Sequence, residues 1–317
     1  MTVLDTAWFE TSNGERLRLD PVHRDRVKPA NSGYGKEGSV DLVPYLVRVE
    51  ERVRLGAHLL ELHGRSVEGA RVLVVGAEDG AEALALLARG AATVTGTDHG
   101  DAFVDDARRR ERDEVRQRVV AVAKEAAAAL SWDSDHLARV HEGVRYEIDD
   151  LCDSSLPDGA FDLIVSWQTL EHIPDVPAAM RETSRLLAPG GLAYHEYNPF
   201  FAIDGGHTPV TLDFAWGHAR LDRADIARFL REHRSEEADE AMSFLDSALN
   251  GASQRDVRSA IEAAGLETCA WIPRFRPEDA LGVTPEILGA VQRLYPSVQL
   301  IDLTSRIVRC VLRRPAG

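Results

Sequence analysis

The sequence predicts an α/β protein with a doubly wound, mostly parallel sheet, and two observations lead to that prediction. A short apolar run at 71–75 precedes a Gly-containing turn, a helix at 81–89 and a second strand at 93–97. Strand, turn, helix and strand within about 30 residues form a βαβ unit. Strands and helices then keep alternating towards the C-terminus, which is the pattern of a parallel sheet with helices on both faces.

The remaining elements follow from apolar periodicity and from helix caps. Helices are predicted where apolar residues recur every three or four positions, and Thr284-Pro285 has the cap and first residue of a helix. These rules predict helices from Asp41 to Gly64, at 176–187, at 255–264 and from Thr284 onward. Five further strands complete a seven-stranded sheet, at 144–148, 163–166, 192–197, 268–273 and 306–312.

Two stretches interrupt this alternation and predict helical insertions. Residues 101–142 are rich in both charge signs, and Val115, Val119 and Val122 form a narrow helical stripe. Residues 199–250 are first rich in Gly and aromatic residues, then helical and charged, whereas the polar residues 1–38 predict little regular structure. The predicted division is an N-terminal arm and helix serving as a lid (1–68), a core (69–198 and 251–317), an inserted acceptor or lid segment (199–250) and a helical insertion (101–142).

Composition narrows the classes of partner and the cellular location. The chain has 317 residues, of which 44% are hydrophobic, and a formal charge of -15. A strongly acidic chain argues against nucleic-acid or anionic-membrane partners, because both require a basic face. Only three cysteines occur, and neither a signal pattern nor an apolar run of membrane-spanning length is present. We therefore expect a cytoplasmic protein without membrane contact.

The turn after the first strand and the end of the second predict a nucleoside site. The turn reads Gly76-Ala-Glu-Asp-Gly80, and Asp98 follows Gly76 by 22 residues. Glycine lets the backbone approach a ligand closely, and the start of the next helix offers free N–H groups. A carboxylate at the end of the second strand accepts hydrogen bonds from ribose hydroxyls.

The next segments resemble the small-molecule branch of the class I S-adenosylmethionine-dependent methyltransferases. That family has an acid after the third strand, Phe-Asp opening the fourth strand, Glu-His-Ile after it and Pro-Gly-Gly before the fifth. The sequence contains these features in the same order, as Asp150, Phe161-Asp162, Glu171-His172-Ile173 and Pro189-Gly190-Gly191. The resemblance covers about residues 70–198 and implies S-adenosylmethionine as the cofactor, a Rossmann-like fold and methyl transfer.

The resemblance also implies roles for individual residues. Asp98 would hold the ribose, Asp150 the adenine amino group, and the turn around Gly76 the methionine part of the cofactor. The N-terminal arm with Tyr34 is either a lid over the cofactor or a segment packed on the surface. The cofactor-binding set predicted in this way is Tyr34, Gly76, Ala77, Glu78, Gly80, Asp98, His99, Asp150, Leu151, Trp167, Gln168 and His172.

Two positions of the turn depart from the family pattern. The family has Gly-x-Gly-x-Gly with an acid two residues before the first Gly, whereas this chain has Glu78 at the middle position and Val74 at the acid position. In one interpretation Glu78 replaces the missing acid and contacts the amino group of the cofactor. In the other, cofactor use is altered.

The segment after the fifth strand provides the candidates for catalysis. Methyl transfer to a hydroxyl requires a group that accepts its proton, and imidazole titrates near neutrality. His207, between Gly206 and Thr208, is the preferred base, and Glu196 is the alternative; His195 and Glu196 lie on opposite faces of a strand. We expect no metal ligands, because His195, Glu196, Asp204, His207, Asp213 and His218 have no spacing typical of a metal site.

Three functions remain to be separated. The first is methylation of a small acceptor, of the kind found in specialised metabolism, at an oxygen, nitrogen or carbon atom. The second is a cyclase or isomerase that binds the same cofactor without methylating, which the altered turn at Glu78 suggests. The third, an NAD-dependent oxidoreductase, is disfavoured because Gly76–Gly80 lacks Gly-x-Gly-x-x-Gly. Both insertions suit acceptor recognition and the contacts of a homodimer.

Overall fold

Seven strands form one sheet in the order β5-β4-β3-β6-β7-β9-β8. The computed structural model describes residues 7–27, 42–99 and 106–316. The strands of the sheet are β3 (Arg71–Val75), β4 (Thr93–Asp98), β5 (Val144–Ile148), β6 (Phe161–Trp167), β7 (Leu187–Tyr197), β8 (Glu267–Phe275) and β9 (Ser305–Arg313). Each neighbouring pair along β5-β4-β3-β6-β7 is parallel. The strand β9 is antiparallel to both of its neighbours, β7 and β8. The predicted mostly parallel, seven-stranded sheet is therefore confirmed.

Helices cover both faces of this sheet, and strand alternation divides the core between them. Val72 and Val74 face one side of β3, and Leu73 and Val75 the other. The first face packs against α2 (Leu42–Leu62), α3 (Ala81–Ala88), α4 (Asp106–Leu130), α5 (Ser134–Ala138) and α6 (Val140–Gly143). The second face packs against α7 (Val176–Leu186) and α12 (Gln254–Ala263). Burial on both faces explains why the central strands β3 and β6 are mostly apolar.

The long helix predicted in the charged insertion is α4, but its buried face differs from the prediction. Val115 is 37% exposed, whereas Val119, Ala123 and Ala127 are buried against the sheet domain. Alanine is small enough to let the helix approach its neighbours, so the contact face of α4 is mainly alanine. Arg116, at the same helical spacing, is 9% exposed and continues this face.

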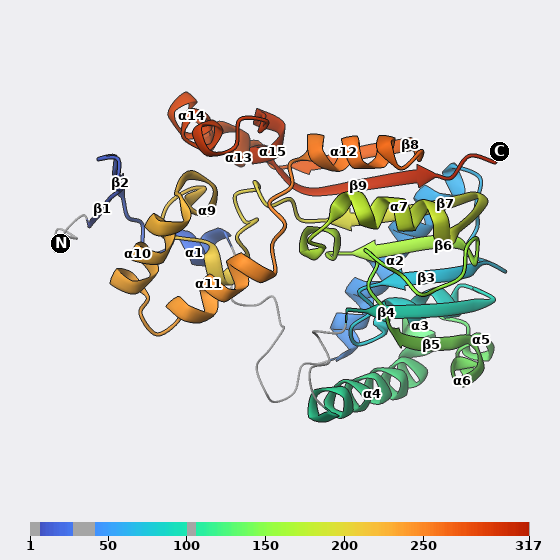
Figure 1. Cartoon of the computed structure of the whole chain (residues 1–317). Helices are drawn as coiled ribbons and strands as arrows, with labels where there is room; N and C mark the ends of the chain where they lie inside the picture. Colours follow the sequence, from blue (N-terminus) through green and yellow to red (C-terminus); the bar gives the residue numbers. More distant parts are fainter. Residues whose placement is uncertain (1–6, 28–41, 100–105, 317) are drawn as a thin grey trace.

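A second group of elements forms a body beside the sheet, which we call the helical lobe. Its two apolar clusters combine residues 9–27 with residues from 200–249 and 283–303. The elements of the lobe are β1 (Trp8–Glu10), β2 (Arg16–Arg18), α1 (His23–Val27), α8 (His207–Val210), α9 (Gly217–Arg220), α10 (Arg223–His233), α11 (Ala238–Ser247), α13 (Pro277–Gly282), α14 (Pro285–Leu294) and α15 (Leu300–Thr304). Figure 1 shows the lobe beside the sheet domain, at the end towards which the parallel strands point.

The N-terminal residues differ from the expectation of little regular structure. The strands β1 and β2 form an antiparallel hairpin with Phe9 opposite Leu17. Each strand has three residues, too few to show a periodic pattern. Phe9 and Leu17 are buried in the lobe, while Leu46 and Val53 of α2 are buried against the sheet. The predicted lid segment 1–68 thus contributes to both bodies, and the domain division itself stays a prediction.

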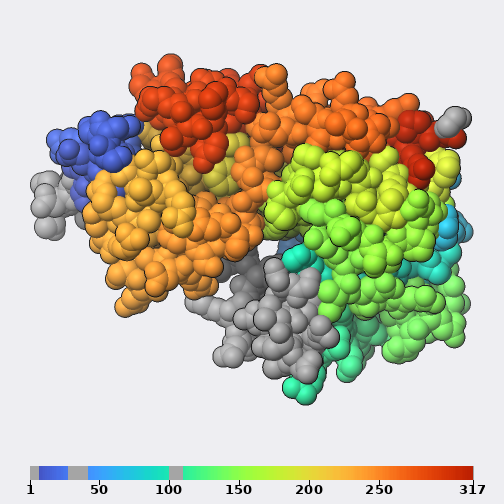
Figure 2. Space-filling model, viewed as in Figure 1, coloured from blue at the N-terminus to red at the C-terminus, as the bar shows by residue number. Residues whose placement is uncertain are grey.

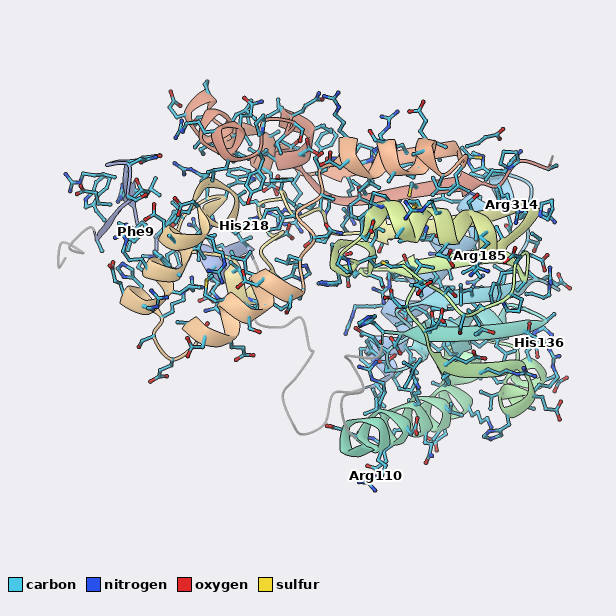
Figure 3. All side chains as sticks on the ribbon, viewed as in Figure 1. Phe9, Arg110, His136, Arg185, His218 and Arg314 are labelled. Carbon is cyan, nitrogen blue, oxygen red and sulfur yellow. The ribbon has the colours of Figure 1, made fainter. Side chains whose placement is uncertain are left out.

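The opposite end of the sheet faces away from the lobe. Figure 3 shows Arg185, Arg314 and His136 at that far end, whereas Phe9 and His218 lie in the lobe. Figure 2 shows the yellow and orange surface of the lobe meeting the green surface of the sheet domain. Across the described residues, none of the helices combines the length and the apolar character needed to cross a membrane.

Candidate active site

A cavity of about 340 Å³ lies where the carboxyl ends of the parallel strands meet the helical lobe. In open α/β sheets this edge is where ligands bind. Five of the lining residues come from the sheet edge, two from α2 and α3, and four from the lobe. They are Gly76, Glu78, Trp167, Gln168 and His172; Arg52 and Glu82; and His207, Thr208, Pro209 and Phe244.

The turn between β3 and α3 requires glycine at both of its ends. Gly76 and Gly80 have φ values of +71° and +80°. A Cβ on Gly76 would come within 2.4 Å of the Thr169 hydroxyl, and one on Gly80 within 2.1 Å of the Tyr146 hydroxyl. Ala77 is buried, and its N–H donates to the Thr97 carbonyl. The turn is therefore fixed tightly against β4 and the end of β6.

Glu78, which departs from the family pattern, lies in this turn and lines the cavity. Its backbone has a left-handed φ of +39°, and its N–H donates to Asp98 Oδ1 over 3.1 Å. Burial raises the pKa of its carboxyl group, and the charges of Asp79 and Asp98 raise it further. Arg112 and His172 oppose that rise, so Glu78 is electrostatically coupled to both.

Asp98 ends β4 and is 7% exposed. Its Oδ2 accepts from Arg116 Nη2 over 3.0 Å and forms an ion pair with Arg112 Nη1 at 3.2 Å. The Arg116 guanidinium also lies 3.8 Å from the centre of the Tyr146 ring and donates from Nε to the Glu78 carbonyl. Two arginines of α4 therefore hold the carboxylate that the resemblance assigns to the ribose.

These two arginines were not among the predicted site residues. The insertion carries many charges of both signs, so charge alone does not distinguish them. The usable signal was the position of Arg116, three residues before Val119 and seven before Ala123, on the buried stripe of α4. An arginine on an apolar stripe requires a partner, because an unpaired buried charge is costly.

The predicted adenine end lies at the outer edge of the sheet. His99 Nε2 is 3.5 Å from Asp150 Oδ2, and the two side chains are 55% and 42% exposed. The other oxygen of Asp150 accepts from the Cys152 N–H over 2.8 Å. Leu151 packs into the core beside α7, so its side chain faces away from this edge. The structure thus brings His99 and Asp150 together on open surface.

Trp167 and Gln168 follow β6 and form the middle of the cavity. The Trp167 ring is 7% exposed and lies 5.7 Å from the Tyr194 ring, and its indole N–H has no hydrogen-bond partner within the described ranges. Gln168 has a left-handed φ of +53°, and its side-chain oxygen accepts from Arg52 over 3.5 Å. Arg52 also pairs with Glu82, whose pKa burial raises to about 7.

The candidates for catalysis separate into two places. The described lining of the cavity includes His207 but neither Glu196 nor His195. Glu196 is 4% exposed and accepts from Arg309 Nε over 2.6 Å. His195, on the other face of β7, has Nδ1 2.8 Å from the Ser166 hydroxyl, and burial lowers its pKa to about 4.

His207 begins α8 and brings the lobe against the sheet edge. Its φ of +50° is in the left-handed region, and a Cβ on the preceding Gly206 would come within 2.9 Å of His218. Its ring lies 5.0 Å from the ring of His172, in the short helix η2 (Leu170–His172), and 5.6 Å from Phe244. The two histidines are therefore neighbours across the cavity. Tyr34, the predicted lid residue, lies outside the described residues.

Comparison with known proteins identifies the family. A family model described as a methyltransferase domain matches residues 48–268, more than two thirds of the chain. The malonyl-[acyl-carrier protein] O-methyltransferase of Halorhodospira halophila (strain DSM 244 / SL1) is 30% identical over 146 residues, which are 44% of this chain and 45% of that protein. The chain thus matches less than half the length of this curated relative.

Solved structures with a similar fold have low sequence identity. Geranyl diphosphate C-methyltransferase from Streptomyces coelicolor A3(2) is 14% identical, with 93% of this chain and 89% of that chain covered and a TM-score of 0.48. An S-adenosylmethionine dependent methyltransferase from Mesorhizobium loti is 16% identical, with 81% and 96% covered and a TM-score of 0.45.

The family model covers the five parallel strands β3 to β7, whereas the antiparallel strand β9, which lies between β7 and β8 in the sheet, is beyond the matched residues. The chain belongs to the class I S-adenosylmethionine-dependent methyltransferase family, whose cofactor is S-adenosylmethionine.

Proposed function

We propose that the chain transfers a methyl group from S-adenosylmethionine to a small-molecule acceptor, at an oxygen, nitrogen or carbon atom. One observation carries the proposal: a single cavity joins the Gly76–Glu78 turn of the sheet edge to His207 and Phe244 of the lobe. In this arrangement the sheet edge binds the cofactor, and the lobe supplies the walls for the acceptor.

The residues of the sheet edge suit the proposed cofactor. Gly76 and Gly80 let the turn pack closely against Thr169 and Tyr146 at the sheet edge, and Asp98 offers a carboxylate at the end of β4. We propose that Ala77, Glu78 and the turn glycines contact the methionine part, and that the ribose contacts Asp98. The proposed contacts of the adenine and the sulfonium end are His99, Asp150, Leu151, Trp167, Gln168 and His172.

Binding at Asp98 requires a change in its present contacts. Its Oδ2 accepts from Arg116 and pairs with Arg112, so ribose hydroxyls must share or replace these partners. Glu78 Nα donates to the other oxygen and ties the turn to the same carboxylate. We propose that cofactor binding shifts the two arginines of α4 away from Asp98.

The chemistry requires alignment and, for a hydroxyl acceptor, a proton acceptor. When bound, the cofactor supplies a methyl group on a positively charged sulfur. The protein must hold the acceptor in line with that methyl group and exclude water. His207 is the proposed base, because its ring lines the cavity beside His172. Glu196 remains the alternative, although Arg309 engages its carboxylate.

The acceptor class and the setting are also proposals. The relative from Halorhodospira halophila is named for O-methylation of malonyl-[acyl-carrier protein]. The walls of the cavity are partly apolar, with Trp167 and Phe244, and partly polar, with Thr208 and the histidines. We propose tailoring of a natural product in the cytoplasm, which the three free cysteines favour, and a homodimer as the assembly.

A second function deserves a parallel test. The ion pairs on Asp98 and the substitution of Glu78 for glycine both alter the cofactor end of the site. These features favour, as the alternative, an enzyme that binds the cofactor and catalyses a cyclisation or isomerisation without methyl transfer.

Calorimetry and isotope transfer separate these functions. We expect S-adenosylmethionine to bind with one site per chain and NAD not to bind. Incubation with methyl-labelled S-adenosylmethionine, a malonyl thioester and extracts of the producing organism should yield a labelled small molecule. Cofactor binding without any labelled product would favour the alternative, and binding of NAD alone would refute both proposals.

Replacing His207 tests the proposed base. We expect His207→Gln to lower kcat about 10²-fold to 10⁴-fold with a hydroxyl acceptor, because general-base catalysis contributes that much. The affinity for S-adenosylmethionine, measured by calorimetry, should stay within about threefold. The matched control is His141→Gln, an exposed histidine of α6. An unchanged kcat would remove His207 from the role.

A further inference from the structure

Three potential metal ligands meet at the cavity: His172 and His207 line it, and Glu171 is buried beside them. Glu171 and His172 come from η2, and His207 comes from the start of α8. One ligand atom from each of the three side chains lies within 4.8 Å of the others. The first two residues are adjacent in sequence and the third is 35 positions later, so no short sequence motif reveals the group.

The orientation of His172 is fixed by a backbone contact. Its Nδ1 forms a short hydrogen bond with the Ala248 carbonyl. A carbonyl oxygen only accepts, so Nδ1 carries the proton and Nε2 of the neutral ring keeps its lone pair. Metal-binding histidines characteristically donate their other N–H to a carbonyl or carboxylate in this way.

Glu171 is fixed in a similar manner. Its side chain is 2% exposed, and Oε1 accepts from the Asn198 N–H over 3.1 Å. The Glu171 carbonyl accepts from the Asn250 N–H. One backbone N–H therefore holds the carboxylate and another holds the main chain of Glu171, and the carboxylate is buried next to two imidazoles. A buried carboxylate is stabilised by a cation or by hydrogen bonds.

The position of His207 is costly for the backbone and is enforced by its surroundings. Its φ of +50° lies in the left-handed region, which non-glycine residues seldom adopt. Gly205 and Gly206 precede it, and a Cβ at either would come within 3 Å of neighbouring backbone oxygens. The packing thereby turns the His207 ring towards His172, with their centres 5.0 Å apart.

The surrounding charge also favours a cation. Glu78 lines the same cavity and is electrostatically coupled to His172. Glu171 and Glu78 therefore face a group whose histidines are neutral when they act as ligands, and a divalent ion offsets the two carboxylates.

From this geometry we infer that Glu171, His172 and His207 bind a divalent first-row transition metal ion, such as Zn²⁺, Fe²⁺ or Co²⁺. Two histidines and one carboxylate are a ligand set for these ions, and three protein ligands leave coordination positions open to the cavity. Two ligand atoms about 2.1 Å from one ion and at the tetrahedral angle lie about 3.4 Å apart, so a pair separated by as much as 4.8 Å must close by more than about 1 Å on loading.

The ion would act on the acceptor side of the cavity. An oxygen of the acceptor can fill an open coordination position, and the ion then lowers the pKa of a bound hydroxyl. Coordination uses the same lone pair of His207 that the proposed base would use. In the metal-loaded protein His207 is therefore a ligand, and the ion replaces it as the group that assists loss of the proton.

Cobalt titration tests the inference without relying on methyl transfer. The purified, chelator-treated protein is titrated with Co²⁺, and binding is followed by visible absorption and calorimetry. We expect one ion per chain, displaced by Zn²⁺. We expect affinity to fall at least tenfold in His207→Ala and in Glu171→Gln, whose amide still accepts from the Asn198 N–H. His141→Ala, which removes an exposed histidine of α6, should bind as the unaltered protein does.

Several outcomes would overturn the inference. One is that Co²⁺ does not bind at one ion per chain, and the other is that His207→Ala and Glu171→Gln both bind Co²⁺ as the unaltered protein does. Circular dichroism and thermal unfolding identify a variant that fails to fold, and the other variant then decides. The inference does not rest on the proposed function. Cobalt binding without labelled product would refute only methyl transfer, whereas labelled product without cobalt binding would refute only the metal site.

Discussion

Asp98 connects more of the site than any other single carboxylate described above. One oxygen accepts from the Glu78 N–H, and the other accepts from Arg116 and pairs with Arg112. The turn after β3, the end of β4 and the helix α4 are thus tied to one side chain. Changes at this residue should affect both ligand affinity and stability.

Replacing Asp98 should weaken cofactor binding and destabilise the fold. Asp98→Ala should lower the affinity for S-adenosylmethionine at least tenfold in calorimetry, because the ribose loses its acceptor. Unfolding in urea should show a loss of about 3–5 kcal/mol, because Arg116 then keeps a buried charge without its partner.

The control for that experiment is an aspartate far from the cavity. Asp135→Ala changes an exposed residue of α5 and should leave both measurements unaltered. If Asp98→Ala fails to fold, Asp98→Asn is used in its place, because its side-chain oxygen still accepts from the Glu78 N–H. Unchanged affinity in a folded Asp98 variant would contradict the assigned contact with ribose.

His195 should make the protein less stable in acid. Burial lowers its pKa from 6.5 to about 4, so the folded protein keeps the ring neutral while the unfolded chain takes up a proton. The unfolded state therefore binds more protons between pH 6.5 and pH 4, and stability falls as the pH falls through this range. His195 contributes up to about 3 kcal/mol to that fall.

His195→Gln tests this contribution. Urea unfolding at pH 7 and pH 4.5 should show a smaller difference in unfolding free energy for the variant than for the unaltered protein. His141→Gln, in which the changed residue is exposed, should keep the original difference. If the unfolding free energy depends on pH equally in all three proteins, the folded protein protonates His195 as readily as the unfolded chain does.

Some site residues could be predicted from sequence, and others could not, for physical reasons. Gly76, Glu78, Trp167, Gln168, His172 and His207 line one cavity. Gly76 was predicted from its place after the first strand and His207 from the glycines before it, whereas the other four were predicted from the resemblance to the methyltransferase family. Arg116 was missed because its partner Asp98 lies 18 positions away on another element. The position of Glu196 against Arg309 depends on how β7 pairs with β9, which no local pattern reveals.

At the scale of elements, α4 has the largest influence on the cofactor edge. Its alanine face packs on the sheet domain, and its arginines occupy the carboxylate at the end of β4. Burial lowers the pKa of Arg116, and Tyr146 and Asp98 oppose that shift. In the proposed binding mode the helix therefore competes with the ribose for the same acceptor.

Removing one arginine should relieve this competition. Arg116→Met keeps much of the side-chain length, and we expect it to raise the affinity for S-adenosylmethionine several-fold while lowering the melting temperature. Arg118→Met, on the exposed side of α4, should change neither. Calorimetry and thermal unfolding measure both effects. If the affinity for S-adenosylmethionine instead falls tenfold, Arg116 contributes to binding of the cofactor.

Element prediction succeeded where a pattern was long enough to be read. The apolar run of β3 and the cap Thr284 of α14, whose side chain accepts from the Ile287 N–H, have direct local signals. The hairpin of β1 and β2 has three residues per strand and was missed. The valine stripe predicted for α4 was wrong at Val115, because alanine permits the closer helix packing that decides burial.

At the scale of the whole molecule, the cofactor edge and the proposed acceptor walls have separate cores. Phe9 is 1% exposed and lies 5.3 Å from the ring of Phe229, with Arg228 over its other face at 4.3 Å. These contacts belong to the lobe, whereas Val72 and Val165 belong to the sheet core. A defect in one core should therefore affect one side of the cavity first.

Phe9→Ala should separate the two sides. Replacing a buried phenylalanine by alanine lowers the free energy of unfolding by about 3–5 kcal/mol. We expect urea unfolding of the lobe to show this decrease. The affinity for S-adenosylmethionine should stay within twofold, while KM for the acceptor rises. Trp8→Ala, which changes the exposed neighbour on β1, is the control. An equal loss of cofactor affinity would mean that the two bodies act as one unit.

The assembly of the lobe could not be predicted from sequence. Sequence patterns report on neighbours along the chain, whereas Phe9, Leu212 and Phe229 meet across about two hundred residues. The sheet was predictable because each βαβ unit is local and its handedness is fixed. The lobe has no such rule.

The hairpin at the N-terminus has a consequence for synthesis. Phe9 and Leu17 leave the ribosome long before the segment around Phe229 exists to cover them. At about 5–20 residues per second, this delay is on the order of tens of seconds. During that time the nascent chain presents two large apolar side chains on a short hairpin, a target for chaperones. A segment made this early is thus among the last to find its native partners.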